Sequence, residues 1–297
     1  MDEVYHIPAM LQETIEGLNI KPEGTYVDVT FGGGGHSRAI MKELTRGGKL
    51  YSFDQDRDAL QNAIDDGRWT FVHSNFRYLH NWMDYYGVEH IDGLLADLGV
   101  SFHHFDCPER GFSFRFSAPL DMRMNQTAKR TAADIVNQYS EEELAKILHL
   151  YGEMKNSRGI AKNICRARSQ KPIERTEDLV AASHIPADMS KELARLFQAL
   201  RIEVNDEMGA LREMLMAARD LLRPGGRIAV LTYHSLEDRL VKNFLRSGNL
   251  EGTREKDFYG NILTPFTLIE KGREASPEEV EQNPRARSAK LRVAEKK

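Results

Sequence analysis

The chain has 297 residues, which is enough for one large domain or two ordinary domains with a full apolar core. Its formal net charge of −4 excludes the strong overall positive field of an indiscriminate nucleic-acid binder, so any nucleic-acid contact must be local. The two cysteines, Cys107 and Cys165, lie far apart and form no C-x-x-C pair, which excludes a disulfide framework and a thiolate zinc site and indicates a reducing compartment.

The N-terminal sequence, MDEVYHIPAM, has acidic residues where a signal peptide would have basic ones. No apolar run approaches the roughly 20 residues that a membrane-spanning helix needs. We therefore expect a cytoplasmic protein with no membrane partner.

The first third of the chain alternates apolar strands with helices. A helix is expected over 9–18, and a strand over 25–31 runs straight into Gly32, Gly33, Gly34 and Gly35, followed by a helix over 37–44. Because parallel strands need a covering crossover helix, this alternation predicts a parallel sheet. Further strands are expected at 49–53, 69–73 and 93–96.

The pattern from about Thr131 to Asn205 is helical throughout and predicts a separate helical lobe. Its helices are expected at 133–139, 141–151, 156–168, 176–183 and 191–202.

The alternation of helix and strand then resumes. A long helix over 207–222, a turn at Pro224 and a strand over 227–233 follow the lobe, so the lobe interrupts one α/β domain rather than joining two. A last strand is expected at 266–270, and the basic segment from Asn283 onward is expected to be a tail of uncertain order. We predict an α/β domain formed by 1–108 and 205–297, with an inserted helical substrate-recognition domain at 109–204.

Two stretches are locally basic and are candidates for RNA contact, although a solvated helix face explains such clusters more often than not. They contain Lys155, Arg158, Lys162, Arg166, Arg168, Lys171 and Arg175, and Arg285, Arg287, Lys290, Arg292, Lys296 and Lys297.

The glycine-rich turn between a strand and a helix is the strongest local signal, because glycine lets the backbone approach a ligand and helix-start N–H groups favour negative charge. The segment 28–36 lacks the third glycine of a dinucleotide fingerprint and the lysine of a phosphate-binding loop, which disfavours NAD and ATP. A nucleotide-like ligand is expected at this turn, and a tight turn without a ligand is the alternative.

Asp54 follows the next apolar strand, where a carboxylate can accept hydrogen bonds from both hydroxyls of a ribose. Asp56 and Asp58 are nearby competitors, and Asp54 is preferred because it directly follows the apolar run. Phe76, after the third strand, is a candidate to flank an adenine ring, with a core position as the alternative.

Asp97 ends the fourth strand, which is the edge where open α/β sheets place their ligands. The exocyclic amine of a nucleobase is a poor nucleophile, and an acceptor for its protons would favour the pyramidal form that attacks a methyl sulfonium. Asp97 is a candidate for that acceptor. Alternatively, it could hold the amino-acid end of a cofactor that carries the methyl sulfonium. The adjacent His103, His104, Asp106 and Cys107 rarely converge on one ion at such spacing, so no metal is expected.

Taken together, seven blocks in order closely resemble the bacterial small-subunit ribosomal RNA cytosine-N4 methyltransferase family. The resemblance covers the chain nearly end to end. The blocks are TFGGGGHS from Thr30, DLGVS from Asp97, RGFSF from Arg110, PLDMRM from Pro119, FQALRI from Phe197, HSLEDR from His234 and NPRARSAKLR from Asn283.

The resemblance implies a Rossmann-like S-adenosylmethionine-dependent methyltransferase sheet with an inserted all-helical domain, acting on N4 of a cytidine in the decoding region of small-subunit ribosomal RNA. It places cofactor contacts on Gly34, Gly35, His36, Asp54, Phe76 and Asp97. His104 stands where the family usually has a glutamine expected to touch the cofactor, so that contact is in question, although histidine can still form one hydrogen bond.

For catalysis the first candidate is Asp97, followed by Asp121 with Arg123, and His234 with Glu237. An ion pair between Asp121 and Arg123 that anchors the insertion, and a helix-capping role for His234, are the structural alternatives. A non-catalytic ribosome-assembly factor that retains a methyltransferase fold is the alternative function, and a homodimer is a possible assembly.

Overall fold

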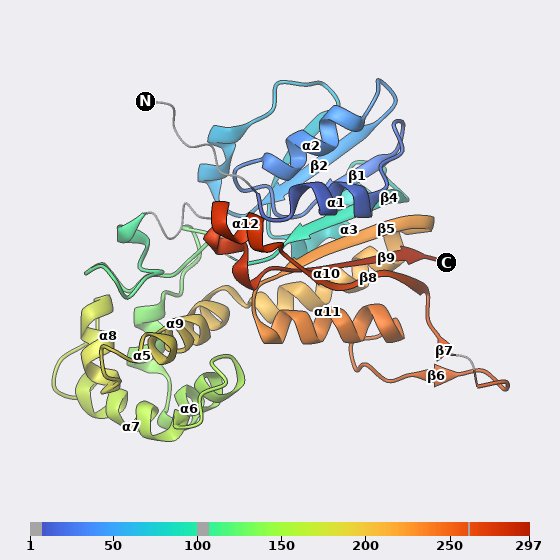
Figure 1. Cartoon of the computed structure of the whole chain (residues 1–297). Coiled ribbons are helices and arrows are strands. Elements are labelled where there is room, and N and C mark those ends of the chain that lie inside the picture. Colours follow the sequence, from blue (N-terminus) through green and yellow to red (C-terminus); the bar gives the residue numbers. More distant parts are fainter. Residues whose placement is uncertain (1–7, 100–106, 261) are drawn as a thin grey trace. The chain divides into compact units, whose positions relative to one another are not determined.

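The computed structural model describes residues 8–99, 107–260 and 262–297, and the chain divides into two compact units (Figure 1). The sheet unit comprises Met1–Gly99 and Met208–Lys297, and the helical unit comprises Val100–Glu207. Within the described ranges, no helix combines the length and the apolar composition that crossing a membrane requires.

The sheet unit is built on a seven-stranded sheet with the order β3-β2-β1-β4-β5-β9-β8. The first five strands of this order are parallel, and β9 is antiparallel to both of its neighbours. The strands are β1 (Thr25–Asp28), β2 (Lys49–Asp54), β3 (Trp69–His73), β4 (Ile91–Asp97), β5 (Leu222–Thr232), β8 (Phe266–Glu274) and β9 (Lys290–Lys296), and a separate hairpin pairs β6 (Glu255–Lys256) with β7 (Ile262–Leu263).

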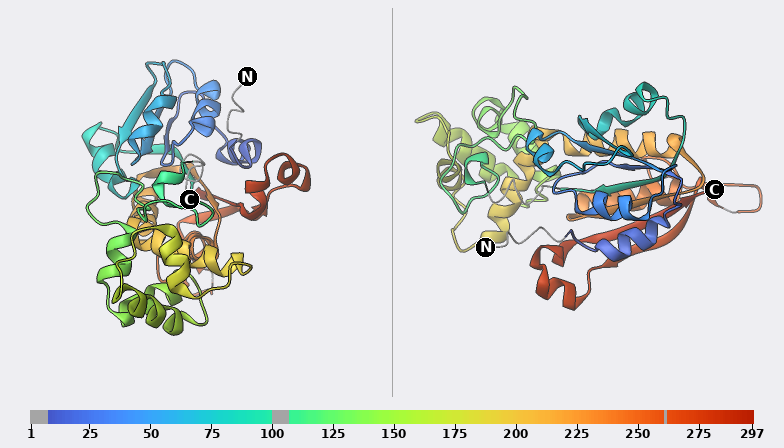
Figure 2. Two further views of the ribbon diagram at one scale, coloured as in Figure 1. Left: turned by 90° about the vertical axis from the view of Figure 1, so that its left-hand side faces the viewer. Right: turned by 90° about the horizontal axis from the view of Figure 1, so that it is seen from above.

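Helices cover both faces of this sheet, which explains why most residues of its central strands are buried. The first six residues of β4 are buried, as expected for a strand covered on both sides. Figure 2 shows α1 (Leu11–Leu18) and α2 (Gly35–Glu43) on one face and α3 (Leu79–Tyr85) and α10 (Glu207–Leu221) on the other. The remaining helical elements of this unit are α11 (Ser235–Ser247), α12 (Pro277–Gln282) and the 3₁₀ turns Arg57–Asn62, Phe76–Tyr78 and Pro284–Ser288.

The predicted strands are all present; the strand over 69–73 has the predicted ends, and the others have shifted ends. The predicted strand over 25–31 ends at Asp28, and β5 begins at Leu222 rather than at Arg227. The parallel arrangement is confirmed for the first five strands.

The expectation of a tail of uncertain order from Asn283 was wrong. Residues Lys290–Lys296 form β9, which lies between β5 and β8 and pairs with both. Its apolar residues Leu291, Val293 and Ala294 are fully buried, so the basic residues that suggested a tail alternate with core positions.

The helical unit contains the five predicted helices, with ends that differ by at most a few residues. Two of them start in capping boxes, at Thr131 with Asp134 and at Ser140 with Glu143, which satisfy free N–H groups at the helix start. The helices are α5 (Ala132–Gln138), α6 (Glu141–Leu150), α7 (Ser157–Arg168), α8 (Thr176–Ser183) and α9 (Ser190–Asn205), and the turn Pro108–Arg110 precedes them. They enclose a core of their own that includes Leu144, Leu148, Ile164, Leu196 and Leu200.

Candidate active site

The strand order of the sheet unit reverses beside β1. The chain runs outward from β1 to β2 and β3 and then returns to β4 on the other side of β1. Loops that leave in opposite directions open a crevice at the carboxyl ends of such strands, where open α/β sheets bind ligands. Asp28, Asp54 and Asp97 end β1, β2 and β4 at this edge.

The glycine turn connects β1 to α2 at the same edge. Gly32 and Gly34 have φ angles of +50° and +74°, which residues with a side chain rarely adopt. A Cβ atom on Gly34 would also lie 2.9 Å from the ring of Phe31, so both conformation and space require glycine there. The turn is held in place because the Phe31 N–H donates to the carbonyl of Phe53 at 2.8 Å.

The carboxylate of Asp54 is tied to the glycine turn. Its Oδ2 accepts from the Gly32 N–H at 2.8 Å, and its Oδ1 accepts from the Asp56 N–H at 2.8 Å. A carboxylate can accept about four hydrogen bonds, and acceptors of this kind are what a ribose diol needs. The preference for Asp54 over Asp56 and Asp58 as the ribose-binding residue stays a prediction.

A buried polar network supports the turn, and local sequence patterns gave no indication of most of it. Asp28 is buried and accepts from the Ser37 hydroxyl at 2.6 Å, and the Ser37 and Ser52 hydroxyls lie 2.8 Å apart. Trp69 Nε1 donates to the Ser52 hydroxyl at 2.9 Å. Burial raises the pKa of Asp28, and the Ser37 hydrogen bond opposes that rise. The network links β1, α2, β2 and β3 next to the turn.

Asp97 lies next to the turn and contacts residues from three other elements. Its backbone N–H donates to the Thr30 hydroxyl at 2.6 Å, and its Oδ1 accepts from the Tyr233 hydroxyl at 2.7 Å. Its Oδ2 lies 3.6 Å from His36 Nδ1. Burial raises the pKa of Asp97 to about 7, while the Tyr233 hydrogen bond lowers it and the charge of Glu237 raises it further. The side chain still keeps 23% of its surface exposed, so a substrate group can reach it.

His36 is the second residue of α2 and follows the glycine turn. Its side chain is 5% exposed, and its Nε2 atom is buried without a hydrogen-bond partner among the described residues. Burial lowers the pKa of His36, and the charge of Asp28 opposes that effect. A buried polar atom without a partner costs free energy, so its presence beside the turn is consistent with a ligand that supplies the missing bond.

Of the two remaining predicted cofactor contacts, Phe76 lies within the described residues, and its contact with the cofactor stays a prediction. Phe76 begins the 3₁₀ turn after β3, with a partly buried side chain, and β3 is the strand next to β2 in the sheet. His104 lies outside the described residues.

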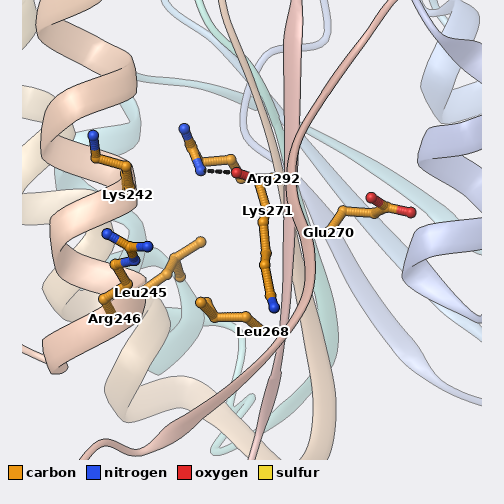
Figure 3. A pocket seen from close by; sticks show the side chains of 7 residues that line it. All are labelled: Lys242, Leu245, Arg246, Leu268, Glu270, Lys271 and Arg292. Atoms are coloured by element: carbon orange, nitrogen blue, oxygen red, sulfur yellow. Dashed lines mark hydrogen bonds between the residues drawn. The ribbon is translucent and has the colours of Figure 1, made fainter.

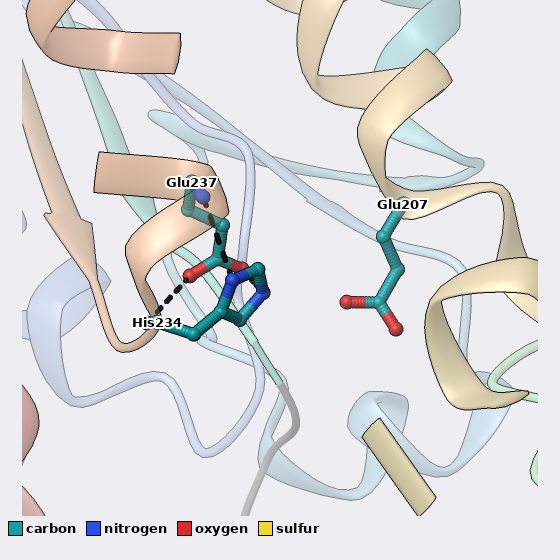
Figure 4. Close-up of side chains that lie close together, drawn as sticks. All are labelled: Glu207, His234 and Glu237. Carbon is teal, nitrogen blue, oxygen red and sulfur yellow. Dashed lines mark hydrogen bonds and ion pairs between the residues drawn. The ribbon is translucent and has the colours of Figure 1, made fainter. Parts of the chain in front are cut away.

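His234 and Glu237 form the N-terminal cap of α11 (Figure 4). The Glu237 N–H donates to His234 Nδ1 at 3.4 Å, and Glu237 Oε2 accepts from the Tyr233 N–H at 3.0 Å. His234 Nε2 lies 3.1 Å from Glu237 Oε1. The capping alternative for His234 is therefore present in the fold, and a catalytic role stays a prediction.

Asp121 and Arg123 pair within the helical unit. Arg123 Nε and Nη2 donate to the two carboxylate oxygens of Asp121 at 2.8 and 2.7 Å. Burial raises the pKa of Asp121, but the Arg123 hydrogen bonds outweigh it and the net pKa is lowered. The ion pair that was the structural alternative exists, and a role for Asp121 in catalysis stays a prediction.

A model of the MraW methylase family matches residues 3–297. The chain belongs to this family. Curated relatives extend over nearly the whole chain: the ribosomal RNA small subunit methyltransferase H of Parabacteroides distasonis is 60% identical and covers 99% of this chain and 98% of its own length. The proteins of the same name from Phocaeicola vulgatus and Bacteroides fragilis are 58% and 56% identical, with coverage of 98% or more of each chain.

The methyl donor of the MraW methylases is S-adenosylmethionine, and the residues at the carboxyl edge fit it. The glycine turn permits close approach of a ligand to the backbone, and His36 presents a buried nitrogen without a partner among the described residues. Asp54 offers carboxylate oxygens at the position from which a ribose diol is commonly bound. These residues would hold the donor, and Asp97 lies next to them, with its Oδ2 3.6 Å from His36 Nδ1.

Proposed function

We propose that this chain transfers a methyl group from S-adenosylmethionine to the exocyclic N4 amine of a specific cytidine in the decoding region of small-subunit ribosomal RNA, in the cytoplasm. The observation that carries the proposal is the Asp97 carboxylate, which lies beside the glycine turn and accepts from Tyr233 at 2.7 Å. Family membership and relatives named ribosomal RNA small subunit methyltransferase H support the choice of substrate.

The chemistry needs an acceptor for the amine protons, because the N4 lone pair is delocalised into the cytosine ring. The donor supplies an electrophilic methyl group on sulfur. Asp97 accepts a hydrogen bond from the amine, which favours the pyramidal form, and takes up the proton that nitrogen releases once the N–C bond has formed and the S–C bond has broken. A pKa of about 7 suits this role, because the carboxylate is substantially ionised at neutral pH and still basic enough to take the proton.

Asp97 has a second possible role, which is to hold the amino-acid end of the donor. The variant Asp97→Asn separates the two. A loss of kcat with little change in the KM for S-adenosylmethionine identifies the proton acceptor, and a rise in that KM with modest loss of kcat identifies the donor contact.

For RNA binding we propose the exposed basic stripe along α7 and the residues just before it, defined as Lys155, Arg158, Lys162 and Arg166. Their spacing of three to four residues places them along one helix face, and no ion pair is present for them in the described part of the chain. Other cations of the predicted clusters are engaged elsewhere: Lys171 pairs with Asp178, Arg175 with Glu177, and Lys290 with Glu274.

Mass spectrometry of ribosomal RNA from cells that lack the protein tests the main proposal. We expect one cytidine of the small-subunit RNA to lose a methyl group, and the methyl group to return with the wild-type gene but not with Asp97→Asn. Calorimetry with S-adenosylmethionine tests the alternative of a non-catalytic assembly factor, which predicts no binding. Sedimentation measurements test the homodimer that the sequence left open.

A further inference from the structure

A basic pocket lies between α11 and β8, three strands away from β4 in the sheet order (Figure 3). Lys242 and Arg246 come from α11, and Lys271 comes from β8. The pocket is also lined by Leu245, Leu268, Glu270 and Arg292. None of these residues belongs to the candidate active site.

Arg292 also lines the pocket, but its charge is neutralised by an acidic partner. Its Nε and Nη2 donate to the two carboxylate oxygens of Asp238 at 2.7 and 3.0 Å, and its Nη1 donates to the carbonyl of Lys271. The side chain is 7% exposed. Asp238 is therefore paired with Arg292, although its charge also interacts with Lys242.

The other charges leave an excess of positive charge at the pocket. Lys242, Arg246 and Lys271 form no ion pair within the described ranges. Glu270 is the one acidic residue of the lining, and Figure 3 shows its carboxylate pointing away from Lys242 and Arg246. Irregular register in β8 between Leu268 and Glu270 and between Lys271 and Arg273 breaks the simple alternation of its side chains, and Lys271 extends along the pocket toward Leu268.

The size of the pocket indicates what kind of anion it suits. Its volume of about 20 Å³ admits roughly one water molecule, so it cannot enclose a free anion such as a nucleotide. The cations that line it can instead contact a phosphate that remains outside the pocket as part of a larger molecule. Lysine side chains contact phosphates as point charges and arginine through several donors.

We propose that this pocket binds a backbone phosphate of the RNA substrate, outside the nucleotide that is methylated. The proposal rests on the proposed function for the identity of the RNA. Strands lie roughly 4.8 Å apart, so three steps from β4 to β8 correspond to at least about 14 Å, and the phosphate belongs to a nucleotide other than the target.

The test compares two triple variants in RNA binding over a range of salt concentrations. The pocket variant is Lys242→Gln, Arg246→Gln and Lys271→Gln. The control is Lys42→Gln, Arg46→Gln and Lys49→Gln, which removes the same charges from exposed residues at the amino edge of the sheet, without ion pairs in the described structure. With a fragment of small-subunit RNA, we expect the pocket variant to raise Kd roughly tenfold and to lower the slope of log K against log salt by about one unit for each phosphate that the variant no longer binds.

The control should bind RNA as the wild type does, and both variants should bind S-adenosylmethionine with unchanged Kd. An unchanged salt slope in a pocket variant that unfolds at the wild-type temperature overturns the proposal. So does calorimetric binding of inorganic phosphate that depends on the three residues while RNA binding does not, because the pocket would then serve a free anion. If the triple variant unfolds early, the single variant Lys271→Gln is measured, with the same criterion.

Different results would contradict the proposed phosphate contact and the proposed function. Phosphate contacts are independent of sequence, so an unrelated RNA of equal length should show the same fall in salt slope. Wild-type protein that leaves the small-subunit RNA unmethylated contradicts the proposed function, whatever the pocket variant does.

Discussion

Tyr233 controls the protonation of Asp97 through the hydrogen bond between their side chains. Burial raises the pKa of Asp97 to about 7, and the Tyr233 hydroxyl lowers it from an even higher value by stabilising the carboxylate. Removing that hydroxyl with Tyr233→Phe raises the pKa, so less carboxylate is present at neutral pH. We expect the acidic limb of the kcat profile to move to higher pH, with a loss of activity at pH 7 that is largely recovered at pH 9.

The matched control is Tyr259→Phe, since Tyr259 is 87% exposed and lies in the hairpin turn between β6 and β7. Its pH profile should coincide with that of the wild type. A Tyr233→Phe profile with the wild-type midpoint would show that Asp97 does not set the acidic limb.

Asp54 should determine the affinity for S-adenosylmethionine. Its carboxylate is next to the glycine turn, and charge-assisted hydrogen bonds to a ribose are about twice as strong as neutral ones. Replacement by alanine is expected to raise the Kd for the donor at least tenfold, as measured by calorimetry. Asp65→Ala, at an exposed acid that follows β2 in the chain, should leave that Kd unchanged, and an unchanged Kd in Asp54→Ala would remove Asp54 from the binding site.

The residues of the site that could be predicted are those whose signal is local. Asp54 and Asp97 each end an apolar run, and the glycines indicate a turn by themselves. The hydrogen bond between Tyr233 and Asp97, and that between Trp69 and Ser52, join residues that are distant in the chain or that meet only when strands pair. Their geometry depends on the strand order, which no local pattern contains.

Two variants of His234, at the start of α11, distinguish a capping role of this residue from a chemical role. His234→Ala removes the acceptor for the Glu237 N–H and should lower the free energy of unfolding by about 1 kcal/mol. Asparagine is a good N-cap, so His234→Asn should stay within about 0.5 kcal/mol of the wild type in denaturant unfolding.

Methylation assays of the same two variants test whether His234 also has a chemical role. Full activity in the stable His234→Asn variant would restrict His234 to capping. Loss of activity without loss of stability would show that the imidazole itself is required.

Helix α7 should contribute RNA affinity through its exposed stripe. Reversing charge with Lys162→Glu and Arg166→Glu is expected to weaken RNA binding and to reduce its dependence on salt. Lys146→Glu with Lys191→Glu changes the net charge equally on α6 and α9, and should have a smaller effect. Equal effects of the two variants would mean that the helical unit attracts RNA only through its overall charge.

Helices and strands were predicted correctly where apolar residues recur at a regular spacing. The prediction failed where charged residues stand between the apolar ones. The helices of the inserted lobe show an apolar period that places Leu144, Leu148 and Leu196 in the core. β9 reads KLRVAEK, and its charged residues suggested a solvated tail. Arg292 is accommodated in the sheet because Asp238, 54 residues earlier in the chain, neutralises it, and that partner cannot be found by a local pattern.

The sheet unit as a whole should depend on β9 for its stability, because β9 bridges β5 and β8. Leu291 is fully buried within it, so Leu291→Ala is expected to cost about 2–5 kcal/mol of unfolding free energy. Phe258→Ser, at a side chain that is 98% exposed, should change stability by less than about 0.5 kcal/mol. Chemical denaturation of both variants checks this, and a small cost at Leu291 would mean that β9 is dispensable to the sheet.

The position of β9 also has a consequence for synthesis of the protein. When β5 has left the ribosome, the strand that covers its outer edge is about 60 residues away in the chain, which is roughly 3 to 12 s of translation at about 5 to 20 residues per second. During that interval the nascent chain carries an apolar strand with unpaired backbone groups, a known template for aggregation. Premature stop codons anywhere between β5 and residue 290 would make that exposure permanent, so truncated products should be insoluble rather than weakly active.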